Sequence, residues 1–411
     1  MNIRFEKTIF IFLVGQGCFV ASAFLFNAVA ARCLGPHEMG IWSLINLIAE
    51  YGMIVTCGVV NGMGREVPYL TGRGDLHATN SVVATTFKIV FLICCALFLV
   101  ALSWTFLAFP YLYPVVLGIT LLISRIIFSF SYILIRSCQD FSLLGLQQFT
   151  IGLIQAAGLL LVWQVRSVPA VLFGTVASLL CGAVFCKKFL VNARSAAYST
   201  AAAKQLIRIG MPIFLVGIIY ALFLSTDRVL IAKFLGVTKL GLYTPAIMAV
   251  GVTSLVPNIV SNVMYPKMAE LYGKTESLLP LIPLVRKIMM INVLLTIVLA
   301  GLFFSIFNYI VIPFFLTDYA AAVPAMIIIL IASIISTIGL SLGDLFNVLG
   351  VQRAFLTNIS IATVVNFITG GLLLLTTGLE LVGVSIGTLS AFMVFSGLQL
   401  VTYQRLLREQ K

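Results

Sequence analysis

The sequence predicts an all-α integral membrane protein with twelve transmembrane helices, arranged as two parallel-repeat six-helix lobes around a central cavity. Three observations predict this class: the composition, the spacing of the apolar runs and an internal repeat. Of the 411 residues, 61% are hydrophobic and only 9% are charged, whereas about a quarter of the residues of a soluble globular protein are charged. The chain is therefore expected to lie in a lipid bilayer, and it lacks the alternating pattern of a membrane β-barrel.

Apolar runs of spanning length follow one another along the whole chain. A bilayer requires about 20 apolar residues per helical span, and backbone groups in hydrocarbon must be hydrogen-bonded within the span. The first run follows MNIRFEKTIF without a small-residue cleavage pattern, so we expect a retained helix. The segment Asn308–Leu316, which contains Pro313, is expected to form a turn. The predicted spans are residues 8–31, 40–60, 80–103, 113–135, 142–164, 169–190, 207–232, 241–265, 280–305, 320–348, 354–376 and 381–403.

The internal repeat covers residues 31–75, which match a later stretch at an offset of 201 positions without a gap. Trp42 meets Tyr243 in this register as a conservative pair. An even number of spans per half gives two halves of the same orientation, as in parallel-repeat transporters. We therefore expect an N-lobe of spans 1–6 (1–194), a cytoplasmic linker (195–206) and a C-lobe of spans 7–12 (207–411). The identical residues are Ala31, Leu34, Gly35, Gly40, Asn61, Met63, Leu70 and Gly72, which meet Ala232, Leu235, Gly236, Gly241, Asn262, Met264, Leu271 and Gly273.

The distribution of basic residues predicts the orientation. With the N-terminus inside, 18 of the 25 Lys and Arg residues lie on the cytoplasmic side and 4 on the outer side. The positive-inside rule then places both termini in the cytoplasm. The net charge of +12 is spread over many short loops, so no nucleic-acid partner is expected. The eight cysteines lie in or beside apolar spans without CxxC spacing, and the two histidines lie in loops; no disulfide, metal or cofactor is expected.

Ionisable residues within spans are costly, so each of them is a candidate functional residue. Glu50 lies on a polar stripe of the second span with Asn46, Cys57 and Asn61, whose spacing keeps one helical face. Such faces should line a wet cavity or bind each other across an interface between helices. The tenth span carries a longer stripe, which comprises Ser333, Thr337, Ser341, Asp344 and Asn347.

The fourth and seventh spans carry the arginine candidates. Arg125 and Arg136 are 11 residues apart, so they project from one face of a helix about 16 Å apart. Asp227 and Arg228 are adjacent, and their side chains diverge by about 100°. A structural pair across helices, for example Asp227 with Arg125, competes evenly with a role in substrate binding.

Two stretches resemble a known family. LGPHEMGIWSLINLIAEYG followed by NGMGREVPYLTGRGD is similar to the N-terminal region of Wzx-type oligosaccharide flippases, in the polysaccharide transport family of the multidrug/oligosaccharidyl-lipid/polysaccharide exporter superfamily. The segments IRSCQDFSLLG and FNVLGVQR agree with it. The resemblance implies a flippase that moves undecaprenyl-diphosphate-linked repeat units, for O-antigen, capsule or a similar glycan, from the inner to the outer leaflet of a bacterial inner membrane. It also implies alternating access and glycan polymerase machinery as a further partner.

This task assigns roles to the candidates. Arginine matches phosphate oxygens with two parallel hydrogen bonds, so Arg125, Arg136 and Arg228 are expected to neutralise the diphosphate. Substrate contact is expected for Asn46, Asn61 and Ser341. Charge balance, or binding of a coupling H⁺ or Na⁺, is expected for Glu50, Asp227 and Asp344. Gating is expected for Arg32, Lys233 and Arg65.

Three alternatives remain. A cation-coupled multidrug exporter of the same superfamily usually carries an acidic residue in its first span, and none occurs between Thr8 and Ala31. A membrane-embedded glycan polymerase or ligase would need a long outer loop with catalytic groups, whereas the predicted outer loops are short. A scaffold for a glycan-assembly complex is the third alternative, and sequence does not decide against it.

Overall fold

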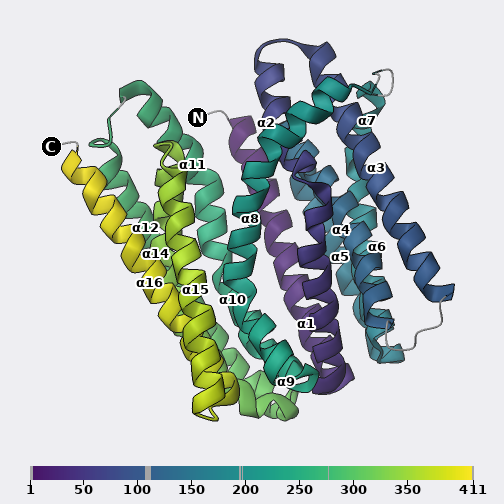
Figure 1. The fold of residues 1–411 in the computed structure, drawn as a ribbon, viewed down its shortest axis with the longest axis vertical. Coiled ribbons are helices and arrows are strands. Elements are labelled where there is room, and N and C mark those ends of the chain that lie inside the picture. Colours follow the sequence, from purple (N-terminus) through teal and green to yellow (C-terminus); the bar gives the residue numbers. More distant parts are fainter. Residues whose placement is uncertain (1–2, 107–112, 194–195, 197, 276, 410–411) are drawn as a thin grey trace. The chain divides into compact units, whose positions relative to one another are not determined.

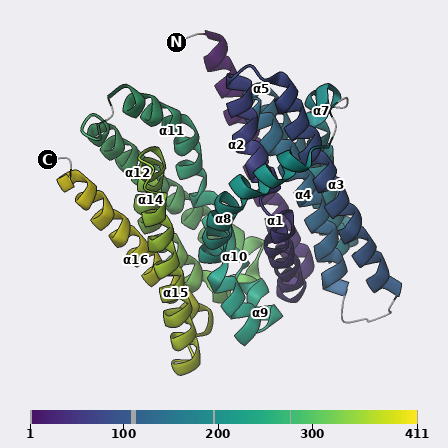
Figure 2. The same cartoon turned by 45° about the horizontal axis from the view of Figure 1, so that its top comes forward.

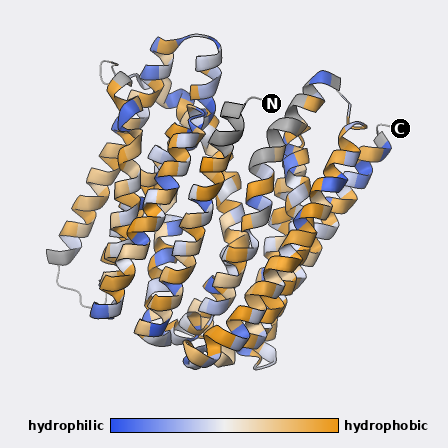
Figure 3. Ribbon diagram, turned by 180° about the vertical axis from the view of Figure 1, so that it is seen from behind, coloured by the Kyte–Doolittle hydropathy of each residue, from blue (hydrophilic) through white to orange (hydrophobic). Residues whose placement is uncertain are grey.

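The structure is a computed structural model that describes residues 3–106, 113–193, 196, 198–275 and 277–409. Every regular element in these ranges is a helix (Figures 1 and 2). Within the residues that the structure describes, eleven helical stretches are long and apolar enough to cross a membrane, and Figure 3 shows mostly hydrophobic ribbon along them. The first stretch, Phe10–Thr56, has 47 residues and covers most of the first two predicted spans, 8–31 and 40–60. The prediction of an all-helical membrane fold is therefore confirmed.

The chain divides into two compact units. The first unit contains Met1–Leu34 and Ile41–Ile218, and the second contains Gly35–Gly40 and Ile219–Lys411. The division falls inside a continuous helix, α8 (Thr200–Phe234), whereas the sequence suggests a linker at residues 195–206. Residues 200–206 form the first turns of α8.

The first unit is a helix bundle that contains both arms of the kinked N-terminal helix α1. At Gly35 the backbone leaves the helical region, with φ 72° and ψ 175°, and Pro36 follows; the two predicted spans are thus two arms of one kinked helix. The second arm ends at Gly52 and is followed by a 3₁₀ turn, Met53–Thr56, after which Cys57 and Gly58 adopt left-handed conformations, with φ 46° and 72°. The helices are α1 (Ile3–Gly52), α2 (Val59–Gly72), α3 (Leu76–Phe106), α4 (Tyr113–Ser137), α5 (Phe141–Val165), α6 (Val168–Ala183) and α7 (Lys187–Ala193).

The second unit packs α14 against α12 and α16, and α15 against α16. Its core includes Phe223 of α8, whose ring lies 4.8 Å from that of Phe392 and 5.3 Å from that of Phe395, between centroids. The expected turn at Asn308–Leu316 is wrong in most of its length, since a π-helical turn at Phe307–Val311 joins α12 to α13. The helices are α9 (Val237–Leu242), α10 (Thr244–Thr253), α11 (Leu255–Thr275), α12 (Leu281–Ile306), α13 (Ile312–Phe314), α14 (Val323–Val348), α15 (Gln352–Thr376) and α16 (Glu380–Glu409).

Candidate functional site

The second arm of α1 and helix α4 pack closely in the first unit because each contributes a glycine to the contact. A Cβ atom on Gly118 would lie 2.8 Å from Cγ2 of Ile48, and one on Gly52 would lie 2.6 Å from Cδ2 of Leu122. Both distances are shorter than van der Waals contact, so only glycine permits this approach without rearrangement. The approach brings the polar residues of this arm within reach of Arg125.

The Arg125 guanidinium binds Asn46. Its Nη2 donates to Oδ1 of Asn46 at 2.6 Å, and its Nη1 donates to the backbone carbonyl of the same residue at 3.5 Å. Nδ2 of Asn46 donates to the carbonyl of Trp42 at 2.9 Å, which fixes the amide so that its oxygen meets the arginine. Arg125 lies at the centre of α4, and both it and Glu50, one turn after Asn46, are half-buried. A held, partly accessible guanidinium in mid-span is suited to bind an anion.

Asn61 does not continue the helical face of Asn46 and Glu50. The left-handed residues Cys57 and Gly58 interrupt the helix, so Asn61 stands on a separate helix, α2. The predicted four-residue stripe therefore divides into two parts. Asn46 and Glu50 share one face of α1, and the half-buried Asn61 lies one turn before Arg65 on α2.

Arg136 and Arg65 are both exposed and lie close to the contact between α2 and α4. The hydroxyl of Ser137 is 3.4 Å from the carbonyl oxygen of Gly64, which places the two helices side by side next to these arginines. Helix α4 runs unbroken from Tyr113 to Ser137. Arg125 and Arg136 thus occupy one helical face, as their spacing predicts.

Asp227 is the buried carboxylate of α8 in the second unit. Its Oδ2 accepts a hydrogen bond from the hydroxyl of Tyr243 at 2.8 Å, and its Oδ1 accepts one from the backbone N–H of Arg228 at 2.7 Å. Ser385 of α16 donates in turn to the Tyr243 oxygen at 3.5 Å. Only 5% of Asp227 is exposed, so its charge state depends on these partners and on any bound cation.

Two residues of the polar stripe on α14 bind side chains of α12. Ser341 is buried and accepts a hydrogen bond from Nδ2 of Asn292, on α12, at 2.8 Å. Thr337 and Thr296 join the same two helices at 3.5 Å. Of the two interpretations of this stripe, binding across a helix interface therefore describes Ser341 and Thr337. Asp344, one turn further, is half-buried.

The cations considered as gating residues lie at exposed positions. Arg32, on the first arm of α1, places its guanidinium carbon 6.0 Å from the ring centre of Trp163. Lys233, at the end of α8, places its ammonium 5.3 Å from the ring centre of Phe234. Both contacts are within the range of cation–π attraction.

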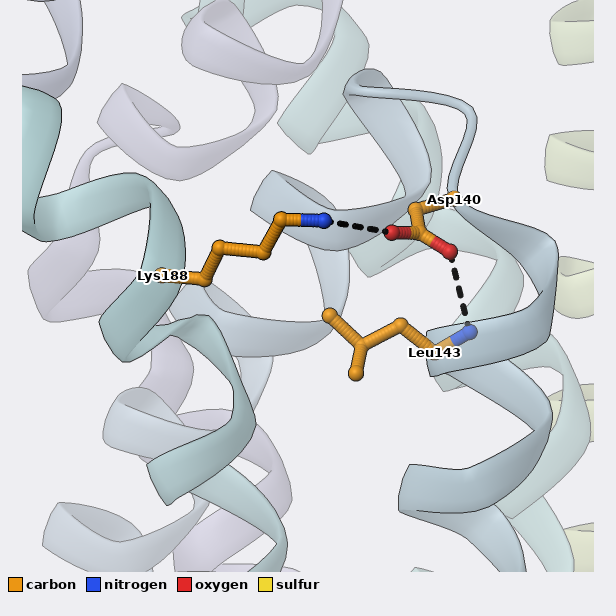
Figure 4. A network of polar contacts seen from close by, with 3 residues as sticks. All are labelled: Asp140, Leu143 and Lys188. Carbon is orange, nitrogen blue, oxygen red and sulfur yellow. Dashed lines mark hydrogen bonds and ion pairs between the residues drawn. The ribbon is translucent and has the colours of Figure 1, made fainter.

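Asp140 connects α5 to the segment after α6 (Figure 4). Its Oδ1 accepts the backbone N–H of Leu143 at 3.1 Å and caps α5, while its Oδ2 lies 3.3 Å from Nζ of Lys188. Nearby Cys138 has a thiol whose pKa is raised above its usual value, first by burial and then by the negative charge of Asp140, with Lys188 acting in the opposite direction. The thiolate fraction of Cys138 is therefore small at neutral pH.

Alkylation of Cys138 should show this pH dependence. In a variant that keeps only this cysteine, we expect maleimide labelling to be slower at pH 7 than that of an unperturbed thiol and to accelerate at alkaline pH. Asp140→Asn keeps a capping oxygen but removes the charge that raises the pKa, so labelling should become faster; Lys188→Ala should make it slower. Mass spectrometry of timed samples measures both, and equal rates in the two variants would contradict the assignment.

Comparison with known proteins identifies the family. A family model described as "Polysaccharide biosynthesis protein" matches residues 29–324. The chain belongs to the polysaccharide biosynthesis protein family. Comparison with curated proteins gives no match. Among solved structures, the chain is similar to an inward-facing multidrug resistance MATE family transporter of the MOP superfamily, with a TM-score of 0.66, 16% identity and coverage of 97% of this chain and 95% of the other. An outward-facing structure of a multidrug resistance MATE family transporter of the MOP superfamily is similar as well, with a TM-score of 0.68 and 13% identity. The match covers 98% of this chain and 96% of the other. This family member therefore has the fold of MATE transporters.

Sequence reasoning about this family member missed two polar partners. Tyr243 meets Trp42 in the repeat, and the hydroxyl that distinguishes the two side chains is the group that binds Asp227. Asn292 is a buried amide within an apolar span. A polar residue in such a span indicates a hydrogen bond to a neighbouring helix, and this was the signal in the sequence that could have identified it. Within the described residues, no three His, Cys, Asp or Glu side chains are grouped as metal ligands would be.

Proposed function

We propose that this member of the polysaccharide biosynthesis protein family is a flippase. Its cargo is an undecaprenyl-diphosphate-linked oligosaccharide repeat unit, which it moves from the inner to the outer leaflet of a bacterial inner membrane by ion-coupled alternating access. The observation that carries the proposal is the Arg125–Asn46 contact at the centre of α4. A guanidinium held at mid-membrane depth can neutralise a diphosphate that has no other counter-charge in hydrocarbon.

The chemistry of the cargo fits the other residues of the first unit. The exposed Arg65 and Arg136 offer two further positive charges beside the contact of α2 and α4. Asn46 and Asn61 supply amides that match sugar hydroxyls. The polyprenyl tail can remain in lipid throughout, so only the diphosphate and the glycan require a polar path. Glycan polymerase machinery would then consume the translocated repeat unit.

The test is a leaflet assay in proteoliposomes. Purified protein is reconstituted with an undecaprenyl-diphosphate-linked oligosaccharide that carries a fluorescent label, and a membrane-impermeant quencher reports the fraction in the outer leaflet. The proposal is supported if glycolipid that was protected from the quencher becomes accessible to it only when the protein is present. No translocation of the glycolipid, together with efflux of a cationic drug by the same vesicles, would instead identify a multidrug exporter. The proposed cytoplasmic termini are tested in cells, where an impermeant maleimide should reach Cys138 only from the cytoplasmic side.

A further inference from the structure

The first arm of α1 and helix α5 lie side by side in the first unit and run in the same direction. A Cβ atom on Gly145 would lie 2.6 Å from the carbonyl oxygen of Ile11, and one on Gly158 would lie 3.3 Å from the ring of Phe26. Residue numbers therefore rise together along the two helices. The last residues of this arm must consequently lie beside the last turn of α5 and the residue that follows it.

Two arginines and a tryptophan meet where these helices end. The guanidinium carbon of Arg32, on α1, lies 6.0 Å from the ring centre of Trp163, on α5, and that of Arg166 lies 5.8 Å from the same ring centre. Nε of Arg166 also donates to the backbone carbonyl of Trp163 at 3.4 Å. Cys33 is close enough to feel the charge of both arginines. We call Arg32, Trp163 and Arg166 the Arg–Trp cluster.

The backbone directs Arg166 into this cluster. Arg166 has a left-handed conformation, with φ 48° and ψ 47°, and its N–H donates to the carbonyl of Val162 at 3.0 Å, which closes α5. A left-handed residue other than glycine is strained, and here its side chain returns over the ring three residues earlier. Helix α6 begins two residues later at Val168, and its N-cap Ser167 makes no side-chain cap. The positive end of the α6 dipole therefore adds to the charge of Arg166.

Positive charge accumulates at this end of the unit. The guanidinium carbons of the two arginines lie within about 12 Å of each other, because both contact one ring, and like charges at that range repel. Between Leu76 and Thr200 the sequence contains a single acidic residue, Asp140, which caps the opposite end of α5. Helices α3 to α7 thus supply no carboxylate here. Both arginines are exposed, and 50% of Trp163 is exposed, so an anion can reach the cluster from the surroundings of the protein.

The anion that fits this position is a phosphate attached to a lipid. Tryptophan is enriched where the hydrocarbon of a membrane meets the headgroups, and the arginine fork matches phosphate oxygens with paired hydrogen bonds. We propose that the Arg–Trp cluster binds the phosphate of a lipid in the outer leaflet. Two lipids carry this group there, the translocated isoprenoid diphosphate and an anionic phospholipid. The placement in the outer leaflet rests on the proposed function.

This site is separate from Arg125. Helices α4 and α5 are joined by a short turn at residues 138–140, so the start of α4 at Tyr113 lies at the same end of the bundle as Trp163. Arg125 is 12 residues from Tyr113, which places it about 18 Å deeper along α4. A lipid phosphate would therefore meet Arg125 within the membrane and the Arg–Trp cluster at its surface.

Trp163 can report binding directly. The chain contains three tryptophans, so Trp42→Phe with Trp104→Phe leaves Trp163 as the only one. Undecaprenyl diphosphate or phosphatidylglycerol is titrated in maltoside micelles, which contain no phosphate, while Trp163 emission is recorded; undecaprenol is the phosphate-free probe. We expect a saturable change with a phosphate lipid and none with undecaprenol. Arg32→Gln and Arg166→Gln should each raise the Kd about tenfold or more, because each removes hydrogen bonds to a charged group.

A matched control and a second measurement keep the result specific. Arg73→Gln, at an exposed arginine of α2 whose guanidinium carbon lies 5.5 Å from the ring centre of Tyr69, should leave the Kd unchanged. If the tryptophan replacements unfold the protein, a variant with native tryptophans and Cys33 as its only cysteine measures the same binding. The phosphate lipid should then protect Cys33 from alkylation, and undecaprenol should not.

The outcomes separate the occupant, the site and the proposed function. Tighter binding of undecaprenyl diphosphate identifies the translocated cargo as the occupant, and tighter binding of phosphatidylglycerol identifies a membrane phospholipid. An equal response to undecaprenol, or an unchanged Kd in both glutamine variants, would overturn the site. Labelling of Cys33 by an impermeant maleimide only from the cytoplasmic side would overturn its outer placement. Arginine-dependent binding without glycolipid translocation by the wild-type protein would refute the flippase and leave the lipid site intact.

Discussion

Arg125→Ala is expected to abolish most glycolipid translocation while the protein remains at its normal abundance in the membrane. The Arg125 side chain is half-buried at the centre of α4, and its loss removes the positive charge held by Asn46. A hydrogen bond to a charged group contributes about 1.5–3 kcal/mol, so the loss of each such bond to the diphosphate corresponds to roughly 10- to 150-fold weaker binding. The leaflet assay measures this as a fall in the initial rate.

The control variants separate charge from geometry at this position. Arg125→Lys keeps the charge but loses the planar fork that meets phosphate oxygens in pairs, so an intermediate rate is expected. Arg405→Ala, at an exposed position of α16, should leave the rate unchanged. Wild-type rates in Arg125→Ala protein would remove this residue from the cargo path. Asn46→Ala should give a smaller defect, because it removes the hydrogen bond to Oδ1 of Asn46 while the positive charge of Arg125 stays.

Much of the fold follows from sequence because spanning helices are fixed by length and hydropathy alone. The boundaries that sequence missed depend on backbone conformation. The α-helix of the second span ends at Gly52, and a 3₁₀ turn at Met53–Thr56 leads to Cys57, a non-glycine residue in a left-handed conformation next to Gly58. No composition rule indicates this change of backbone conformation. The helix after Ile306 continues through a π-helical turn at Phe307–Val311 despite Pro313. A proline that follows such a turn is accommodated without a loop.

The candidate site, like the fold, is predicted by the sequence only in part. A charge in mid-span can be found from sequence, because its burial is costly in any fold. The partner of such a charge cannot be found from sequence. Asn46 and Arg125 meet through the close packing at Gly118 and Gly52, which is a tertiary property. The α14 stripe is the converse case. Ser341 has the polarity of a cavity residue, but Asn292 of the neighbouring helix occupies its hydroxyl.

Asp227→Asn is expected to make translocation independent of an imposed proton or sodium gradient. A carboxylate in the membrane interior must be paired, protonated or bound to a cation. The Tyr243 hydroxyl and the Arg228 N–H donate to Asp227 and stabilise its charged form. Asparagine carries no charge: its Oδ1 can still accept the Arg228 N–H, and its Nδ2 can donate to the Tyr243 hydroxyl oxygen, which then acts as the acceptor. The variant should therefore keep its local structure and lose only the exchange of a cation at this position.

Initial rates in proteoliposomes with and without each gradient measure the coupling. A wild-type protein accelerated by one gradient but not the other identifies the ion, and Asp227→Asn should remove that acceleration while leaving the basal rate. Asp318→Asn, an exposed carboxylate of the same unit, is the matched control and should stay coupled. If Asp344→Asn or Glu50→Gln abolishes the acceleration and Asp227→Asn does not, the coupling ion binds elsewhere. Asp227 would then be a structural partner of Tyr243, because its hydrogen bonds alone would account for its burial.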